Sequence, residues 1–101
     1  MIDIVESIKE HFDSEYPNEG CCIVIDVGSE TLQWIPSKNV SETPETAFEI
    51  EERIFVENLL YSNIVGIVHN HIDSDSKPSQ QDLDACKAIK IPYWIFSYPK
   101  M

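Results

Sequence analysis

Four residues that can bind a metal or move a proton follow one another at fixed spacing in the second half of the chain. His69 and His71 are separated by one residue, and after a gap of seven residues Ser79 and Asp82 follow, with two residues between them. The apolar run 64–68 precedes them, and its β-branched content favours a buried strand. Side chains two apart in a strand share a face, so both imidazoles can reach one point. Two nitrogens at one point indicate a metal site.

The third ligand must come from elsewhere, because a catalytic zinc typically takes three protein groups and leaves a fourth position for water. The stretch after the second histidine is long enough to turn the chain back, and Pro78-Ser79 is then typical of a helix start. Asp82 would lie in the first turn of that helix, near the end of the histidine strand. We therefore predict one Zn²⁺ per chain, held by His69, His71 and Asp82.

Each half of this pattern has a simpler interpretation. The segment from Ser79 to Asp82 also fits an acidic variant of the helix capping box, in which the serine accepts a backbone N–H and the carboxylate reaches back. A lone His-x-His also arises from ordinary strand alternation. The joint pattern, with four specified residues on strand, loop and helix start, favours the metal site.

The chain resembles the JAMM (MPN-plus) zinc metallopeptidases. The signature of that family is a distant Glu followed by His-x-His, seven residues, Ser, two residues and Asp, and the later four positions match here in full. In the family the distant Glu lies just before an apolar strand near the N-terminus, often after Tyr-Pro and beside cysteines. Tyr16-Pro17 and the pair Cys21-Cys22 flank Glu19 in this chain, so Glu19 matches that position.

The resemblance implies both a fold and a reaction. The fold would be α/β, a mixed β-sheet flanked by helices, which is the MPN (JAMM) domain of the cytidine-deaminase-like type. The reaction would be hydrolysis of an amide or isopeptide bond in a protein or peptide substrate, with zinc lowering the pKa of its bound water to about 7. Glu19 would act as general base and then general acid, and Ser79 would donate a hydrogen bond to the developing oxyanion.

Within the family the chain is most similar to the N-terminal peptidase-like domain of the tail assembly proteins of long-tailed bacteriophages. The shared features are the paired cysteines, Cys86 in the helix after the aspartate, and an aromatic strand that begins at Pro92. This resemblance implies work in tail assembly or maturation, with tail proteins as partners. The alternative is a non-catalytic interaction module that binds zinc mainly for folding, since metal binding can stabilise small domains outright.

Composition limits the other classes of function. With 101 residues, of which 43% are hydrophobic, we expect one metallopeptidase domain over residues 1–101. The net charge of -11 and the seven Lys and Arg residues argue against nucleic-acid binding, which needs clustered positive charge. No apolar run approaches the ~18 residues that a membrane span needs. No leader segment is recognised at the start, so we expect a cytoplasmic protein that does not enter a membrane.

The three cysteines are too few for a disulfide framework, and their number is odd. A Cys–His peptidase would need Cys22 or Cys86 beside His11 or His71. Buried, unreactive thiols are the simpler interpretation.

Hydrophobic spacing and turn residues predict an alternating order of elements. In chain order these are a helix over 3–15, a hairpin of strands 21–27 and 31–35, a short strand over 46–50, a helix from about 50 to 62, the histidine strand, a helix to about residue 90, and a closing strand over 92–96.

Overall fold

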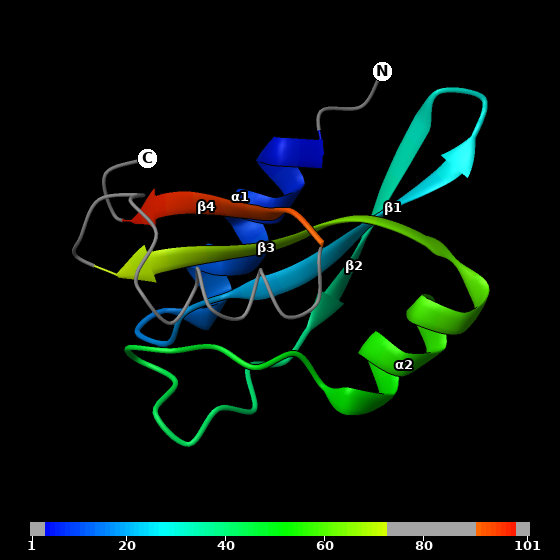
Figure 1. The fold of residues 1–101 in the computed structure, drawn as a ribbon. Coiled ribbons are helices and arrows are strands. Elements are labelled where there is room, and N and C mark those ends of the chain that lie inside the picture. The colour runs from blue at the N-terminus through cyan, green and yellow to red at the C-terminus, as the bar shows by residue number, and fades with distance from the viewer. Residues whose placement is uncertain (1–3, 73–90, 99–101) are drawn as a thin grey trace.

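A four-stranded mixed sheet forms the centre of the molecule (Figure 1). The structure is a computed structural model that describes residues 4–72 and 91–98. The sheet order is β2-β1-β3-β4; β1 is antiparallel to both neighbours, whereas β3 and β4 run parallel. The elements are α1 (Ile4–Glu15), β1 (Cys21–Gly28), β2 (Thr31–Ser37), α2 (Glu52–Tyr61), β3 (Asn63–Ile72) and β4 (Tyr93–Tyr98).

The helix α1 is fixed by two apolar side chains one helical turn apart. Ile8 and Phe12 are fully buried and join a core cluster with Cys22, Val24 and Val68 from the sheet. Residues four apart lie on the same face of a helix, so both side chains pack against the same face of the sheet. The helix ends before Tyr16-Pro17, as expected where proline disfavours the helical conformation of the preceding residue.

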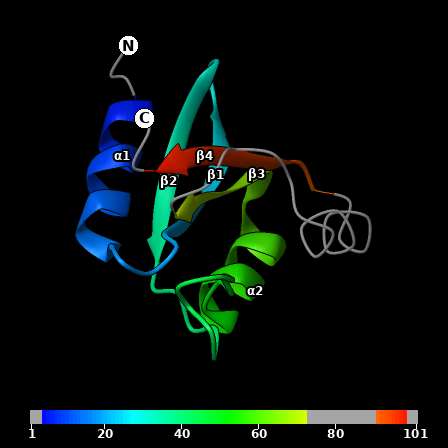
Figure 2. The ribbon, with the colours of Figure 1, turned by 90° about the vertical axis from the view of Figure 1, so that its left-hand side faces the viewer.

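The two faces of the sheet carry different residues. One face packs on α1 and includes Cys22, Val24 and Val68. The opposite face, here called the histidine face, carries Cys21 and Ile23 of β1 and their partners His69 and Ile67 of β3. Figure 2 shows α1 and α2 on opposite sides of the sheet. The sheet is therefore flanked by helices, as predicted.

A tight two-residue turn joins β1 to β2 and projects beyond the rest of the sheet (Figure 1). Its residues Ser29 and Glu30 have φ angles of 55° and 58°, and Gly28 before them has a φ of 91°. Successive positive φ angles at the two central residues are the mark of the type I′ turn, whose twist suits a hairpin. The predicted hairpin is confirmed.

The other predicted elements have mixed outcomes. The first two helices, the histidine strand and the closing strand are confirmed, with shifts of a few residues at their ends. The predicted short strand over 46–50 is wrong: among the described residues this stretch contributes one isolated bridge, between Asn39 and Ile50. Its backbone groups bond instead to turn carbonyls and to the Asn39 side chain. The helix predicted from Ser79 to about Lys90 lies outside the described residues.

The described part of the chain contains no helix with the length and apolar character that a membrane crossing requires.

Candidate functional site

The two histidines converge at the end of β3. Both belong to the strand Asn63–Ile72, and their side chains point to the same face because they are two residues apart. His69 is fully buried and His71 is 9% exposed. Their Nε2 atoms lie 3.3 Å apart. The prediction that the two imidazoles meet at one point is confirmed.

The separation of the nitrogens suits a shared zinc ion. Zn–N bonds of about 2.0–2.1 Å at a tetrahedral angle place two ligand nitrogens roughly 3.3–3.4 Å apart. The observed 3.3 Å matches this value. The same distance also permits an N–H···N hydrogen bond between two neutral imidazoles. The geometry therefore fits two of the three predicted ligands, and metal analysis separates the two interpretations.

Glu19 lies where the chain enters β1, beside the histidine end of β3. Cys21 is paired with His69, and Gly20 O accepts a hydrogen bond from Asn70 N at 3.3 Å. The segment that leads into β1 therefore stays beside β3 beyond the last pair of the ladder. Continuing the antiparallel register by two residues beyond the pair Cys21 and His69 puts Glu19 across from His71. Glu19 is only 6% exposed. A buried acidic residue at this position is what the proposed general base requires.

Backbone hydrogen bonds hold Glu19 against the connection between β2 and α2. Its N–H donates to Pro44 O at 2.7 Å. Its carbonyl accepts from Asn39 Nδ2 at 2.8 Å. Both backbone groups of Glu19 are therefore satisfied by residues of the connection between β2 and α2.

An aromatic enclosure surrounds His69. Phe48 stacks on the imidazole with ring centroids 4.1 Å apart and an interplanar angle of 19°, and Tyr93 meets it edge-on at 5.6 Å. The rings of Phe48 and Tyr93 also contact each other, with centroids 5.7 Å apart. These rings leave the His69 side chain little freedom to rotate away from His71.

Asn70, between the two histidines, points to the other face of the sheet. It is fully buried, and its Oδ1 accepts a hydrogen bond from Gly20 N at 2.6 Å. This bond ties the start of β1 to β3 and so helps to fix the register that sets Glu19 opposite His71. The asparagine is structural in this arrangement and faces away from the imidazoles.

The thiols of Cys21 and Cys22 are buried and free. Burial raises the pKa of Cys21 to about 12, opposed by a hydrogen bond to Ser37, with nearby Glu15, Glu19 and Glu51 adding to the rise. Burial likewise raises the pKa of Cys22 to about 12. A thiol nucleophile must ionise near neutral pH, so neither cysteine suits a Cys–His peptidase. Cys86, the other thiol considered for that role, lies outside the described residues.

Ser79 and Asp82, the remaining predicted site residues, also lie outside the described residues. Among residues 4–72 and 91–98, no cluster of three His, Cys, Asp or Glu side chains forms a complete metal centre. The third ligand and the oxyanion donor therefore stay predictions.

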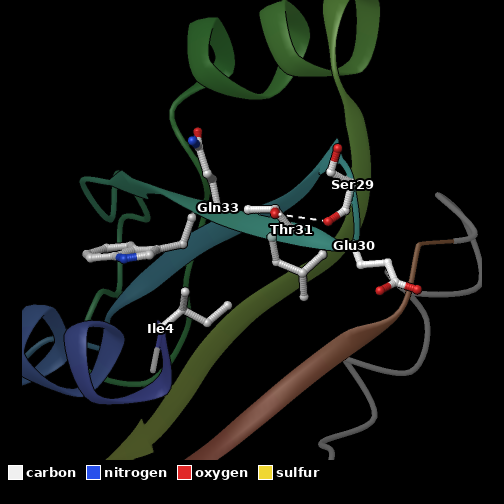
Figure 3. A pocket seen from close by; sticks show the side chains of 7 residues that line it. Ile4, Ser29, Glu30, Thr31 and Gln33 are labelled. Atoms are coloured by element: carbon white, nitrogen blue, oxygen red, sulfur yellow. Dashed lines mark hydrogen bonds between the residues drawn. The ribbon is translucent and has the colours of Figure 1, made fainter. Parts of the chain in front are cut away.

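A hollow of about 660 Å³ lies at the other end of β1, beside the hairpin (Figure 3). It is lined by Ile4 of α1, the turn residues and the start of β2, where Thr31 Oγ1 donates to Ser29 O at 3.3 Å. The β1–β3 register separates the two regions, since His69 faces Cys21 while the hairpin follows Asp26. The hollow is therefore distinct from the candidate site.

Sequence reasoning missed three residues of the candidate site: Phe48 and Tyr93, which contact His69, and Asn39, which contacts Glu19. Tyr93 was assigned to the closing strand, and the parallel pairing of β4 with β3 brings it to His69. Phe48 and Asn39 lie in an irregular connection, where no periodicity shows which way a side chain points. An asparagine within a polar stretch was the only available signal for Asn39.

Comparison with known proteins agrees with this fold. Residues 2–101 match the family model of prokaryotic homologues of the JAB domain. The chain belongs to this family. It is 31% identical over 96 residues to the tail tip assembly protein K of Escherichia phage N15, a match that covers 95% of this chain and 39% of that protein. The chain thus spans well under half the length of this relative.

A solved structure supports the fold alone. The solution structure of protein DSY2949 from Desulfitobacterium hafniense superposes with a TM-score of 0.71 at 20% sequence identity, covering 96% of this chain and 73% of that one. The predicted family resemblance, including its likeness to phage tail assembly proteins, and the predicted fold class are confirmed.

Proposed function

We propose that this domain is a zinc-dependent metallopeptidase that hydrolyses an amide or isopeptide bond during phage tail assembly or maturation. The observation that carries the proposal is the 3.3 Å separation of the two Nε2 atoms on a buried strand end. The family membership of the chain and its similarity to a tail tip assembly protein support the setting.

The proposed roles are assigned to residues of this chain. His69 and His71 would hold zinc with Asp82, and the bound ion would supply a Lewis acid that activates water for attack on the carbonyl. Glu19 would take a proton from the attacking water and deliver it to the leaving amine. Ser79 would donate its hydroxyl to the oxygen that gains negative charge. The buried surroundings of Glu19 and His69 would exclude bulk water from these transfers.

A second candidate is an interaction module that binds zinc for stability and has no hydrolytic activity. The observation that favours it is that the named relative is an assembly protein, of which this domain matches only 39%. Protein partners of the tail would then bind the domain without being cleaved.

Substitution of Glu19 by Gln separates the two candidates. The amide keeps the size of the side chain but cannot take a proton, so Glu19→Gln should keep zinc and fold and lose hydrolysis by ~100-fold or more. The assay is cleavage of a pooled peptide library, followed by mass spectrometry with and without a chelator. Glu10→Gln on the exposed side of α1 is the matched control and should retain full activity. Cleavage that persists in Glu19→Gln would rule out the base role, and a wild-type protein that binds zinc but cleaves nothing would support the interaction module.

A further inference from the structure

Asn39 makes an unusual number of hydrogen bonds for one side chain. Its Nδ2 donates to Glu19 O at 2.8 Å, to Ala47 O at 2.9 Å and to Pro44 O at 3.3 Å. Its Oδ1 accepts from Ser41 N at 3.0 Å and from Glu49 N at 3.1 Å. A side-chain amide has two N–H hydrogens and one acceptor oxygen, so all of its bonding capacity is used.

These bonds give the connection between β2 and α2 a fixed shape. Asn39 forms a bridge with Ile50, and Val40 N donates to Glu49 O at 3.0 Å, so the two ends of the connection lie side by side. At its base, Glu51 N donates to Ser37 Oγ at 2.9 Å. The half-buried Asn39 side chain hydrogen-bonds across this closed loop, in place of the ladder that a regular strand would have provided.

The closed loop contacts the candidate site at two points. Glu19 has its N–H bonded to Pro44 O and its carbonyl bonded to Asn39 Nδ2, and Asn39 Nδ2 also contacts Pro44 O. Phe48, which follows Ala47 in the same loop, stacks on His69 with ring centroids 4.1 Å apart. One asparagine therefore links the backbone of Glu19 to the ring that confines His69.

We propose that Asn39 is a positioning residue for the candidate site, which holds Glu19 in place beside the histidine pair. The inference rests on the proposed function for the role of Glu19, but the hydrogen-bonded link itself does not depend on catalysis.

The test uses the full chain with Asn39→Asp. The carboxylate keeps the shape and the acceptor oxygen but loses both N–H donors and turns an oxygen toward three carbonyls. We expect hydrogen exchange at the Glu19 amide, followed by NMR, to become at least tenfold faster, with the His69 ring signals shifted as Phe48 loses its stacked position. Asn39→Ala, which adds no charge, should give the same faster exchange. Asn58→Asp is the matched control, because Asn58 Nδ2 donates to Ile54 O at 2.8 Å within α2, and it should leave Glu19 exchange unchanged.

Kinetics provide the second arm, on a peptide cleaved by the wild-type protein. Both Asn39 variants should keep zinc, lower kcat about tenfold and leave KM unchanged, a split that a general loss of stability would not give. Unchanged exchange at Glu19, or unchanged kcat in a variant whose Glu19 exchanges faster, would overturn the positioning role. Loss of the whole fold in both Asn39 variants would also overturn the positioning role. If exchange at the Glu19 amide is faster in the Asn39 variants but the wild-type protein cleaves no peptide, the hydrogen-bonded link is supported and the proposed function is rejected.

Discussion

The two ends of β1 lie in opposite environments. Cys21 and Cys22 at its start are fully buried, and the chain there runs beside the histidines of β3. Its last residues, from Asp26 to Gly28, are exposed and lead into the projecting hairpin. Titratable and hydrogen-bonding groups at the first end are enclosed by side chains from several elements, whereas those at the second end meet solvent. The difference indicates that tertiary packing, more than strand propensity, sets the chemistry available at each end.

The largest expected effect is on metal content, which should depend on the first end alone. Wild-type protein purified without added metal should contain about one zinc per chain, and His69→Ala combined with His71→Ala should contain none, measured by elemental analysis. His11→Ala is the matched control, since His11 Nε2 lies 3.2 Å from Cys21 O on the α1 side, and its zinc content should be unchanged. Equal zinc content in all three proteins would contradict a metal site at His69 and His71.

Single substitutions of Asp82 and Ser79 test the predicted metal site further. Asp82→Ala should shed zinc, because a ligand is lost, while Ser79→Ala should keep zinc and lose rate through the missing oxyanion donor. If the segment only caps a helix, each change should cost ~1 kcal/mol of stability and leave the metal alone. Zinc content and melting temperature of both variants decide between these interpretations.

Two glycines at the two ends provide the next comparison. A Cβ at Gly20 would collide with the buried Phe12 ring, whereas a Cβ at Gly28 would meet nothing within 4 Å. Gly20→Ala should therefore lower the free energy of unfolding by up to about 3 kcal/mol through overpacking. Gly28→Ala should cost ~1 kcal/mol, because its φ of 91° disfavours a side chain.

The substitution Phe12→Leu separates overpacking at Gly20 from backbone strain at Gly28, and urea unfolding measures both. In that background Gly20→Ala should cost less, since the shorter side chain leaves room, while the cost of Gly28→Ala should not change. Independent, additive effects at Gly20 and Phe12 would show that the helix does not limit the space at this end of β1.

The buried thiols predict a loss of stability in alkaline solution. Their folded pKa of about 12 lies above the ordinary value of 9.0, so the unfolded state ionises first as the pH rises. The contribution of the thiols to stability should be constant below pH ~9 and then fall, toward pH ~12, by about 1.4 kcal/mol per pH unit for each thiol. Cys22→Ala should reduce this slope by roughly half in urea titrations at several pH values. A slope unchanged by the substitution would assign the effect to other groups.

The smallest expected effect is a gain at the hairpin end. Glu30 occupies a φ of 58°, where a side chain is strained and glycine is not. Glu30→Gly should therefore raise the free energy of unfolding by about 0.5–1 kcal/mol. Glu10→Gly, in the regular helix α1, should lower it by about 1 kcal/mol. Thermal unfolding of both variants measures the contrast, and a loss in Glu30→Gly would contradict the strained turn.

How far the sequence alone predicts this molecule depends on the kind of residue. Ile8 and Phe12 repeat at helical spacing, and the tight turn at Ser29-Glu30 separates two apolar runs, so local patterns were enough for these elements. The convergence of His69 and His71 followed from strand alternation, which acts within one element. Asn39 and Phe48 were missed because their positions depend on hydrogen bonds across an irregular loop, which leave no periodic pattern. Glu19 was found through family resemblance, since its burial depends on pairing with a distant strand.

The parallel pairing of β4 with β3 has a consequence for the order of folding. The strands β1, β2 and β3 lie between Cys21 and Ile72 and pair antiparallel, beginning with a hairpin closed by two residues. The strand β4 begins at Tyr93, so during synthesis it emerges only after β1, β2 and β3 are complete. During synthesis, we therefore expect the histidine strand to be anchored before Tyr93 reaches His69. The enclosure of the imidazoles would then be the last part of the domain to assemble.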